Sequence, residues 1–279
     1  MTILAVGAAG KFAGLVIPAL ARRGARVRGF IHKPEDADQV RNHGAIEVVV
    51  GDLRDRASLD TALRGIEAVF YIPPAFLTDE ADVGKGVVEA ARKAGVRRFV
   101  FSSVIHPVLT SLVNHAAKVP VEEAVLDSGL EYTFLHPTLY YQNYARLWPR
   151  IVETGVLAEP WSAETRFSRV DYRDVAEVAA IALTENRLLY GTFELCASGI
   201  LNRRDVAALI GDVLRRKIEV GQADAGDDAP KPLKAMFEHY NHHGVLGSPV
   251  TLRAILGREP RTLRGYFEEL AAGGKSPGQ

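Results

Sequence analysis

The sequence predicts an α/β protein built around a doubly wound parallel sheet. Apolar segments with the character of strands alternate with helix-like segments over the first two thirds of its 279 residues. This alternation is typical of a parallel sheet with helices on both faces. Right-handed crossovers give such a sheet the strand order 3-2-1-4-5-6, and ligands bind at the carboxyl ends of the strands, near the point where the order reverses.

A glycine-rich turn, residues 7–14 (GAAGKFAG), is the second observation. It leaves a short apolar strand, residues 2–6, and enters a helical run near residue 12. A glycine pattern in this context is typical of a turn that binds a dinucleotide. Gly7 permits the tight turn, and Gly10 has no side chain to hold a pyrophosphate away from the backbone. The phosphates would lie at the positive end of the first helix. The expected contacts are Gly7, Ala8, Ala9, Gly10, Lys11 and Phe12.

The remaining elements follow in a regular order. Strands are expected at residues 25–32, 45–53, 67–75, 97–104, 130–137 and 191–198. Helices are expected between them at residues 58–65, 79–95, 118–129 and 174–185. The longest of these helices repeats its apolar residues at helical spacing and ends at a glycine, through Val83, Val87, Val88, Ala91 and Gly95.

The residues that follow the second, third and fourth strands predict how the nucleotide is recognised. His32 and Lys33 are basic where an NAD-binding chain usually carries an acid for the ribose 2′-hydroxyl, so NADP is preferred and NAD is the alternative. Asp52, beside Leu53, either accepts a hydrogen bond from the adenine amino group or merely begins a turn. The apolar segment after the fourth strand can line the cofactor channel with Ile72, Pro73 and Pro74.

The composition excludes several classes of function. Thirty-four basic residues balance thirty-four acidic ones, so the chain has no excess of positive charge that would favour binding to nucleic acid or to an anionic membrane. No apolar stretch is long enough to span a bilayer, and the chain enters a strand at once, so a cytoplasmic location is expected. The only cysteine, Cys196, excludes an intrachain disulfide framework. No metal is expected, because too few ligands accompany His239, His242 and His243.

The motifs together resemble the NmrA-like family of atypical short-chain dehydrogenase/reductases. The resemblance covers nearly the whole chain, in order, through GAAGKFAG, VRGFIHKP, GDLRDRASLDTALRG, AGVRRFVFSSV, AAKVPVEEAVLDSGLEYTFLHPTLYYQN, DYRDVAEVAAIALTE and ILGREPRTLRGYFEE. It implies a Rossmann-type lobe that binds NAD(P), expected at residues 1–139 with 168–198. It also implies a smaller, mostly helical C-terminal lobe that closes a substrate cleft, expected at residues 140–167 with 199–279.

Lys118 is the residue to which the resemblance gives most importance. In the family, the lysine of the K-x-x-x-E segment lies beside the nicotinamide ribose, and here that segment joins Lys118 to Glu122. Because residues i and i+4 share a helix face, Glu122 can orient Lys118, although an ordinary exposed helix pair has the same spacing. The resemblance thus implies a lysine that hydrogen-bonds the ribose hydroxyls, with proton transfer as a second, less favoured role.

The chain departs from the wider superfamily at positions whose residues take part in proton transfer. Asn114 stands four residues before the lysine, where classical members have the tyrosine acid of Tyr-x-x-x-Lys. Ser102 ends the fifth strand, where a serine usually assists that tyrosine. The sixth strand ends in His136-Pro137, where the family often has Arg-Pro, and His136 is either a structural histidine, the commoner case, or a titrating group. The expected cofactor contacts at this end are Ser102, Lys118, Pro137 and Thr138.

Aromatic and amide side chains follow the sixth strand closely. They form the expected wall for a flat aromatic substrate such as a quinone, or they hold the two lobes together. The residues assigned to substrate on this basis are Tyr140, Tyr141, Asn143 and Trp161.

The resemblance leaves more than one function open, because the family includes isoflavone-reductase-like enzymes, NADPH:quinone oxidoreductases and redox-sensing regulators. The leading hypothesis is an NADPH-dependent oxidoreductase that transfers hydride to a small quinone-like or aromatic acceptor. The alternative is a non-catalytic NADP(H) sensor that acts through a protein partner. A sugar-nucleotide epimerase or dehydratase is disfavoured by the missing tyrosine.

Overall fold

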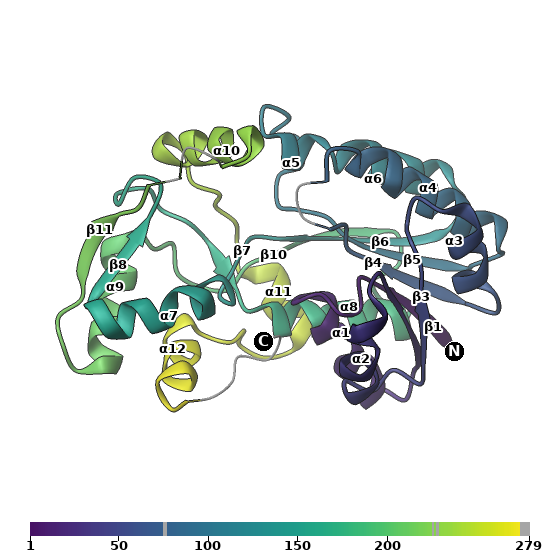
Figure 1. Cartoon of the computed structure of the whole chain (residues 1–279), viewed down its shortest axis with the longest axis horizontal. Helices are drawn as coiled ribbons and strands as arrows, with labels where there is room; N and C mark the ends of the chain where they lie inside the picture. Colours follow the sequence, from purple (N-terminus) through teal and green to yellow (C-terminus); the bar gives the residue numbers. More distant parts are fainter. Residues whose placement is uncertain (75–76, 225, 227–228, 274–279) are drawn as a thin grey trace.

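Seven parallel strands form the central sheet, which confirms the predicted fold class (Figure 1). The computed structural model describes residues 1–74, 77–224, 226 and 229–273. The strand order is β3-β2-β1-β4-β5-β6-β10, so the predicted order is correct and a seventh strand extends it beside β6. The strands are β1 (Thr2–Val6), β2 (Arg26–Ile31), β3 (Glu47–Val50), β4 (Ala68–Tyr71), β5 (Arg98–Ser102), β6 (Glu131–Pro137) and β10 (Gly191–Leu195).

Helices cover both faces of the sheet, and this arrangement explains the continuous apolar runs of its strands. In β1, Ile3 and Ala5 lie in one core, whereas Leu4 and Val6 lie in the other. The first face is covered by α1 (Ala13–Arg22), α8 (Tyr172–Thr184) and α11 (Val250–Leu256). The opposite face is covered by α3 (Arg56–Leu63), α4 (Glu80–Lys93) and α6 (Val119–Asp127).

Shorter elements surround the sheet. The turn η1 (Pro34–Asp36) and helix α2 (Ala37–Asn42) follow β2. Strands β7 (Leu139–Tyr140) and β9 (Arg169–Val170) pair in parallel just after β6 in the chain. Helix α5 (Val113–Ala116) contacts α10 (Lys231–His242), and Figure 1 shows the two helices side by side above the sheet.

A separate hydrophobic core lies beyond β6, among elements that Figure 1 shows at the far end of the molecule from β1. It includes Trp148, Ile210 and Phe267, which are all buried. Side-chain caps begin α9 and α12: the side chains of Asn202 and Asp205 form a capping box, and Thr262 accepts a hydrogen bond from Gly265. The elements are α7 (Asn143–Thr154), β8 (Val156–Glu159), α9 (Arg203–Leu214), β11 (Glu219–Gln222) and α12 (Leu263–Ala271).

The division of the chain into two lobes with the expected boundaries remains a prediction. Helix α11 packs on α8 and β10, and its residues Leu252 and Ile255 belong to the core of the sheet, although residues 199–279 were expected in the second lobe. Residue 75, at the end of the fourth expected strand, lies outside the described residues. Among the described helices, none has the length and apolar character to cross a membrane.

Candidate cofactor and acceptor site

The glycine turn after β1 has the tight geometry that its sequence predicts. Gly7 has a φ of +71°, in the left-handed region that favours glycine. The N–H of Gly10 donates to the carbonyl of Gly7 at 2.7 Å and closes the turn. A Cβ added at Gly10 would lie 2.9 Å from that carbonyl oxygen, so any side chain there forces the backbone to move. Both positions therefore require glycine.

Backbone N–H groups at the start of α1 are left without partners. The N–H groups of Ala9, Lys11, Phe12 and Ala13 donate no hydrogen bond to any described residue. No described side chain caps α1, and its first turn holds no acidic residue. Unpaired donors at the positive end of a helix are a ready site for phosphate. The turn thus fits the pyrophosphate of a dinucleotide.

The ends of β2 and β3 leave a cation exposed beside this turn. His32 and Lys33 are exposed, with His32 Nδ1 3.4 Å from the carbonyl oxygen of Gly51. Within the described part of the chain Lys33 forms no ion pair, so its ammonium is available to an anion. Asp52 accepts a hydrogen bond from the backbone N–H of Arg54 at 2.9 Å, which is the turn-forming role for that carboxylate.

The end of β4 lies next to the glycine turn. The carbonyl oxygen of Ile72 is 3.8 Å from the position that a Cβ on Gly7 would take. Ile72 and Pro73 are half-buried and Pro74 is exposed. Leu53, after β3, is half-buried against the core on the α3 and α4 side. Of these residues, Ile72 is the one that the structure places against the turn.

Lys118 is paired with a residue that the sequence did not single out for the site. Its ammonium forms a hydrogen-bonded ion pair with Glu80 in the first turn of α4, and it lies 3.3 Å from the carbonyl oxygen of Asn114. Lys118 is 9% exposed and Glu80 is 3% exposed. The expectation that Glu122 orients Lys118 is therefore wrong. Glu80 is an acidic residue at the start of a helix, which is a common position for such a residue. Nothing in the spacing of the sequence links it to a lysine 38 residues later.

Glu122 instead joins the ends of β5 and β6. Its Oε1 accepts a hydrogen bond from the Ser103 hydroxyl at 2.5 Å and lies 2.9 Å from Nε2 of His136. Ser103 and His136 are both buried. His136 is thus held by a carboxylate at the carboxyl edge of the sheet, one residue before the predicted contact Pro137.

Other predicted cofactor contacts have their side chains occupied by the protein. The hydroxyl of Ser102 is fully buried and lies 3.0 Å from that of Tyr172. The hydroxyl of Thr138 donates to the carbonyl of Ser168 at 2.8 Å. Pro137, which precedes Thr138 at the end of β6, is buried. These residues offer a ligand no free hydroxyl, so any contact they make is through backbone or apolar atoms.

The segment between β7 and α7 contacts the glycine turn. The ammonium of Lys11 donates to the backbone carbonyl of Gln142, just before α7. Burial, and then the Arg146 guanidinium, lowers the pKa of Lys11. The ring of Phe12 packs 4.4 Å from that of Tyr140, measured between ring centroids. Tyr140, which the sequence assigns to substrate, therefore lies beside the phosphate-binding turn.

The other residues expected to bind substrate are not brought together. Tyr141 is 1% exposed in the hydrophobic core that includes Trp148 and Phe267, where its hydroxyl donates to the carbonyl of Arg261 at 3.3 Å. Asn143 is exposed at the start of α7. Trp161 packs in a different aromatic cluster, with its ring centroid 5.6 Å from that of Tyr240 on α10. The structure thus places these four side chains in separate surroundings.

The three histidines near the end of α10 lie close together without forming a ligand set. The rings of His239 and His243 are 5.2 Å apart, and His242 Nε2 is 3.2 Å from Oε1 of Glu238. Across the described residues, no group of three or more His, Cys, Asp or Glu side chains is placed to hold a metal ion.

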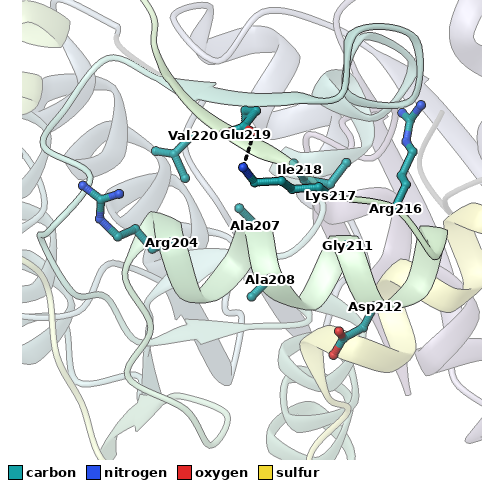
Figure 2. A pocket seen from close by; sticks show the side chains of 10 residues that line it. All are labelled: Arg204, Ala207, Ala208, Gly211, Asp212, Arg216, Lys217, Ile218, Glu219 and Val220. Atoms are coloured by element: carbon teal, nitrogen blue, oxygen red, sulfur yellow. Dashed lines mark ion pairs between the residues drawn. The ribbon is translucent and has the colours of Figure 1, made fainter.

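A groove of about 680 Å³ lies elsewhere, between α9 and residues 216–220 (Figure 2). Figure 2 shows Arg204 and Arg216 along it, with Lys217 paired to Glu219 at 2.7 Å. None of the residues that line it belongs to the predicted cofactor or substrate set. We therefore do not include this groove in the candidate site.

Comparison with known proteins relates this site to nucleotide-dependent reductases. The chain is 32% identical to the (4-alkanoyl-5-oxo-2,5-dihydrofuran-3-yl)methyl phosphate reductase of Streptomyces griseus, over 96% of this chain and 98% of that protein. It is 28% identical to the NAD(P)H azoreductase of Xenophilus azovorans, over 93% of this chain and 92% of that protein.

The fold is shared with the NADPH-dependent quinone oxidoreductase QOR2 of Escherichia coli, crystallised with NADPH. The TM-score is 0.83 at 22% identity, over 97% of this chain and all of that structure. The model of the NmrA-like family matches residues 1–267. The chain therefore belongs to the NmrA-like family.

Proposed function

We propose that the protein is an NADPH-dependent oxidoreductase that transfers hydride to a small quinone-like or aromatic acceptor. The observation that carries this proposal is the set of unpartnered N–H groups at the start of α1, which fits a dinucleotide pyrophosphate. The family membership and the names of the two reductase relatives support the same class of reaction.

The preference for NADPH rests on the end of β2. The exposed imidazole of His32 and the exposed ammonium of Lys33 suit a 2′-phosphate, and an acid that would select the free 2′-hydroxyl is absent from these two positions. Charge-assisted hydrogen bonds to phosphate contribute about 1.5–3 kcal/mol of binding free energy each.

The role of Lys118 in this proposal is to hold the nicotinamide ribose. Glu80 and the backbone carbonyl of Asn114 take two of the three N–H donors of the ammonium, so one donor is left for a ribose hydroxyl. When bound, NADPH supplies the hydride. The protein then has to orient the acceptor and exclude water, which are the larger requirements for reduction of a quinone.

The test is stopped-flow oxidation of NADPH by a quinone, with Lys118→Ala as the variant. We expect Lys118→Ala to weaken NADPH binding and to lower quinone reduction by a similar factor, about tenfold or more for one lost charge-assisted hydrogen bond. Tight NADPH binding without oxidation by any acceptor would favour the NADP(H) sensor instead. Undisturbed NADPH binding in Lys118→Ala would remove that residue from the site.

A further inference from the structure

A buried histidine, His136, stands at the end of β6. The carboxylate of Glu122 holds His136 at 2.9 Å and the hydroxyl of Ser103 at 2.5 Å. Arginine in such a pair is permanently charged, whereas an imidazole can release its proton near neutral pH. The same carboxylate therefore holds a group that can deliver a proton in this chain.

The two ring nitrogens of His136 have different surroundings. A carboxylate only accepts hydrogen bonds, so Nε2 donates its proton to Glu122. Nδ1 bonds to no described residue, and it is not among the buried side-chain atoms that lack a partner, so it is within reach of solvent. In the protonated imidazole, the transferable proton is therefore the one on Nδ1.

Two charged residues on the elements next to His136, Glu194 and Lys118, are paired with other side chains. Glu194 on β10 is its register neighbour and is paired with His106 at 3.3 Å. Lys118, one turn before Glu122 on the chain, is paired with Glu80. Glu122 is thus the carboxylate that bonds directly to His136.

We propose that His136 is the proton donor of this site, and that the site therefore serves acceptors whose reduced form is strongly basic, such as an azo group or a conjugated alkene. This inference rests on the proposed hydride transfer. The hydride adds to one end of the acceptor's double bond, which reduces the acceptor to an anion and leaves NADP⁺. The Nδ1–H bond of His136 then breaks as a new N–H or C–H bond forms on the acceptor, and water returns the proton to the ring.

Other candidate donors are less suitable. Lys118 is held by Glu80, and Asn114 has no acidic proton. Burial raises the pKa of the Tyr140 hydroxyl and of the Tyr172 hydroxyl, and Tyr172 is also bonded to Ser102. A quinone needs no donor, because its reduced oxygens are stable as weakly basic anions and can be protonated by water after the hydride has been transferred. A built-in donor is useful only for a more basic product.

The decisive comparison uses two acceptors, methyl red for the azo class and menadione for the quinone class, with His136→Arg and His136→Gln. Arginine keeps the positive charge and a hydrogen bond to Glu122, but it does not release a proton. We expect both variants to lower the ratio of methyl red to menadione turnover about a hundredfold, the low end of general acid catalysis. His242→Gln is the matched control, because His242 is also paired with a glutamate, at 3.2 Å, but is exposed.

The pH profile gives a second, independent readout. Wild-type turnover of methyl red should fall as the pH rises and the proton donor is lost, and His136→Arg should lack that fall. Circular dichroism checks that each variant is folded, and His136→Arg serves if His136→Gln is not. A wild-type turnover ratio in His136→Arg, or no methyl red reduction by a protein that reduces menadione, would overturn the donor role alone. Failure of the wild type to bind NADPH would overturn the proposed function as well.

Discussion

The buried ammonium of Lys118 is paired with the carboxylate of Glu80, and not with that of Glu122 four residues further along the same segment. Glu80 reaches it from the first turn of α4, so the pair connects the helix after β4 to the helix after β5. The pairing frees Glu122 to hold His136. Lys118 and His136 are thus held by two different carboxylates, Glu80 and Glu122.

Removing Glu80 should destabilise the protein. Glu80→Ala leaves the ammonium of Lys118 buried without a counter-ion, and breaking a buried pair from one side costs about 3–5 kcal/mol. We expect a loss of this size in the free energy of unfolding, measured with urea. The double variant Glu80→Ala/Lys118→Met should recover part of it, because it removes the stranded charge. Glu89→Ala, on the exposed face of α4, is the control, and an equal urea midpoint for Glu80→Ala and this control would show that the buried pair carries no stability.

Lys33 should decide the preference between the two nicotinamide cofactors. Wild-type protein is expected to bind NADPH more tightly than NADH by about 1.5–3 kcal/mol, since the 2′-phosphate adds a charge-assisted contact. Lys33→Ala should remove most of that difference and leave NADH affinity nearly as it was. Calorimetric titration with both cofactors measures it. Equal affinities in the wild type, or an unchanged preference in the variant, would contradict this assignment, and Lys217→Ala controls for a general loss of positive charge.

The sequence predicted those features that short stretches of chain determine. The strand order follows from alternating elements with right-handed crossovers, and the glycine turn follows from Gly7 and Gly10 at fixed offsets after a strand. The Lys118–Glu80 pair was out of reach because it depends on how α4 packs beside α6. Tyr141 faces a core because the chain turns into α7 directly after β7. The direction of that turn cannot be predicted from the positions of the aromatic residues in the sequence.

Acid should destabilise the protein partly through His115. This ring is 1% exposed, with Nδ1 3.0 Å from the carbonyl oxygen of His106, and burial is the main cause that lowers its pKa below 6.5, with the positive charge of Lys118 adding to it. The folded state therefore binds fewer protons than the unfolded state, so stability is lost as the pH falls through about 6.5 and below, by about 1.4 kcal/mol per unit of pKa shift. Urea unfolding at pH 7.5 and 5.5 should show a smaller loss in His115→Gln than in the wild type. An identical loss in both proteins would mean that other groups cause the acid sensitivity.

Gly10→Val should abolish cofactor binding while the sheet remains folded. A Cβ at this position would lie 2.9 Å from the Gly7 carbonyl, so the turn has to open and the unpartnered N–H groups at the start of α1 lose their common direction. The branched side chain would also take space needed by the pyrophosphate. Gly86→Ala is the matched control, because Gly86 lies within α4 and a Cβ there has no heavy atom within 4 Å. Fluorescence titration with NADPH measures binding, and circular dichroism must show a native spectrum for both variants. If folded Gly10→Val still binds NADPH with wild-type affinity, the phosphates do not lie at this turn, and the assignment of Lys33 and Lys118 to the same nucleotide fails with it.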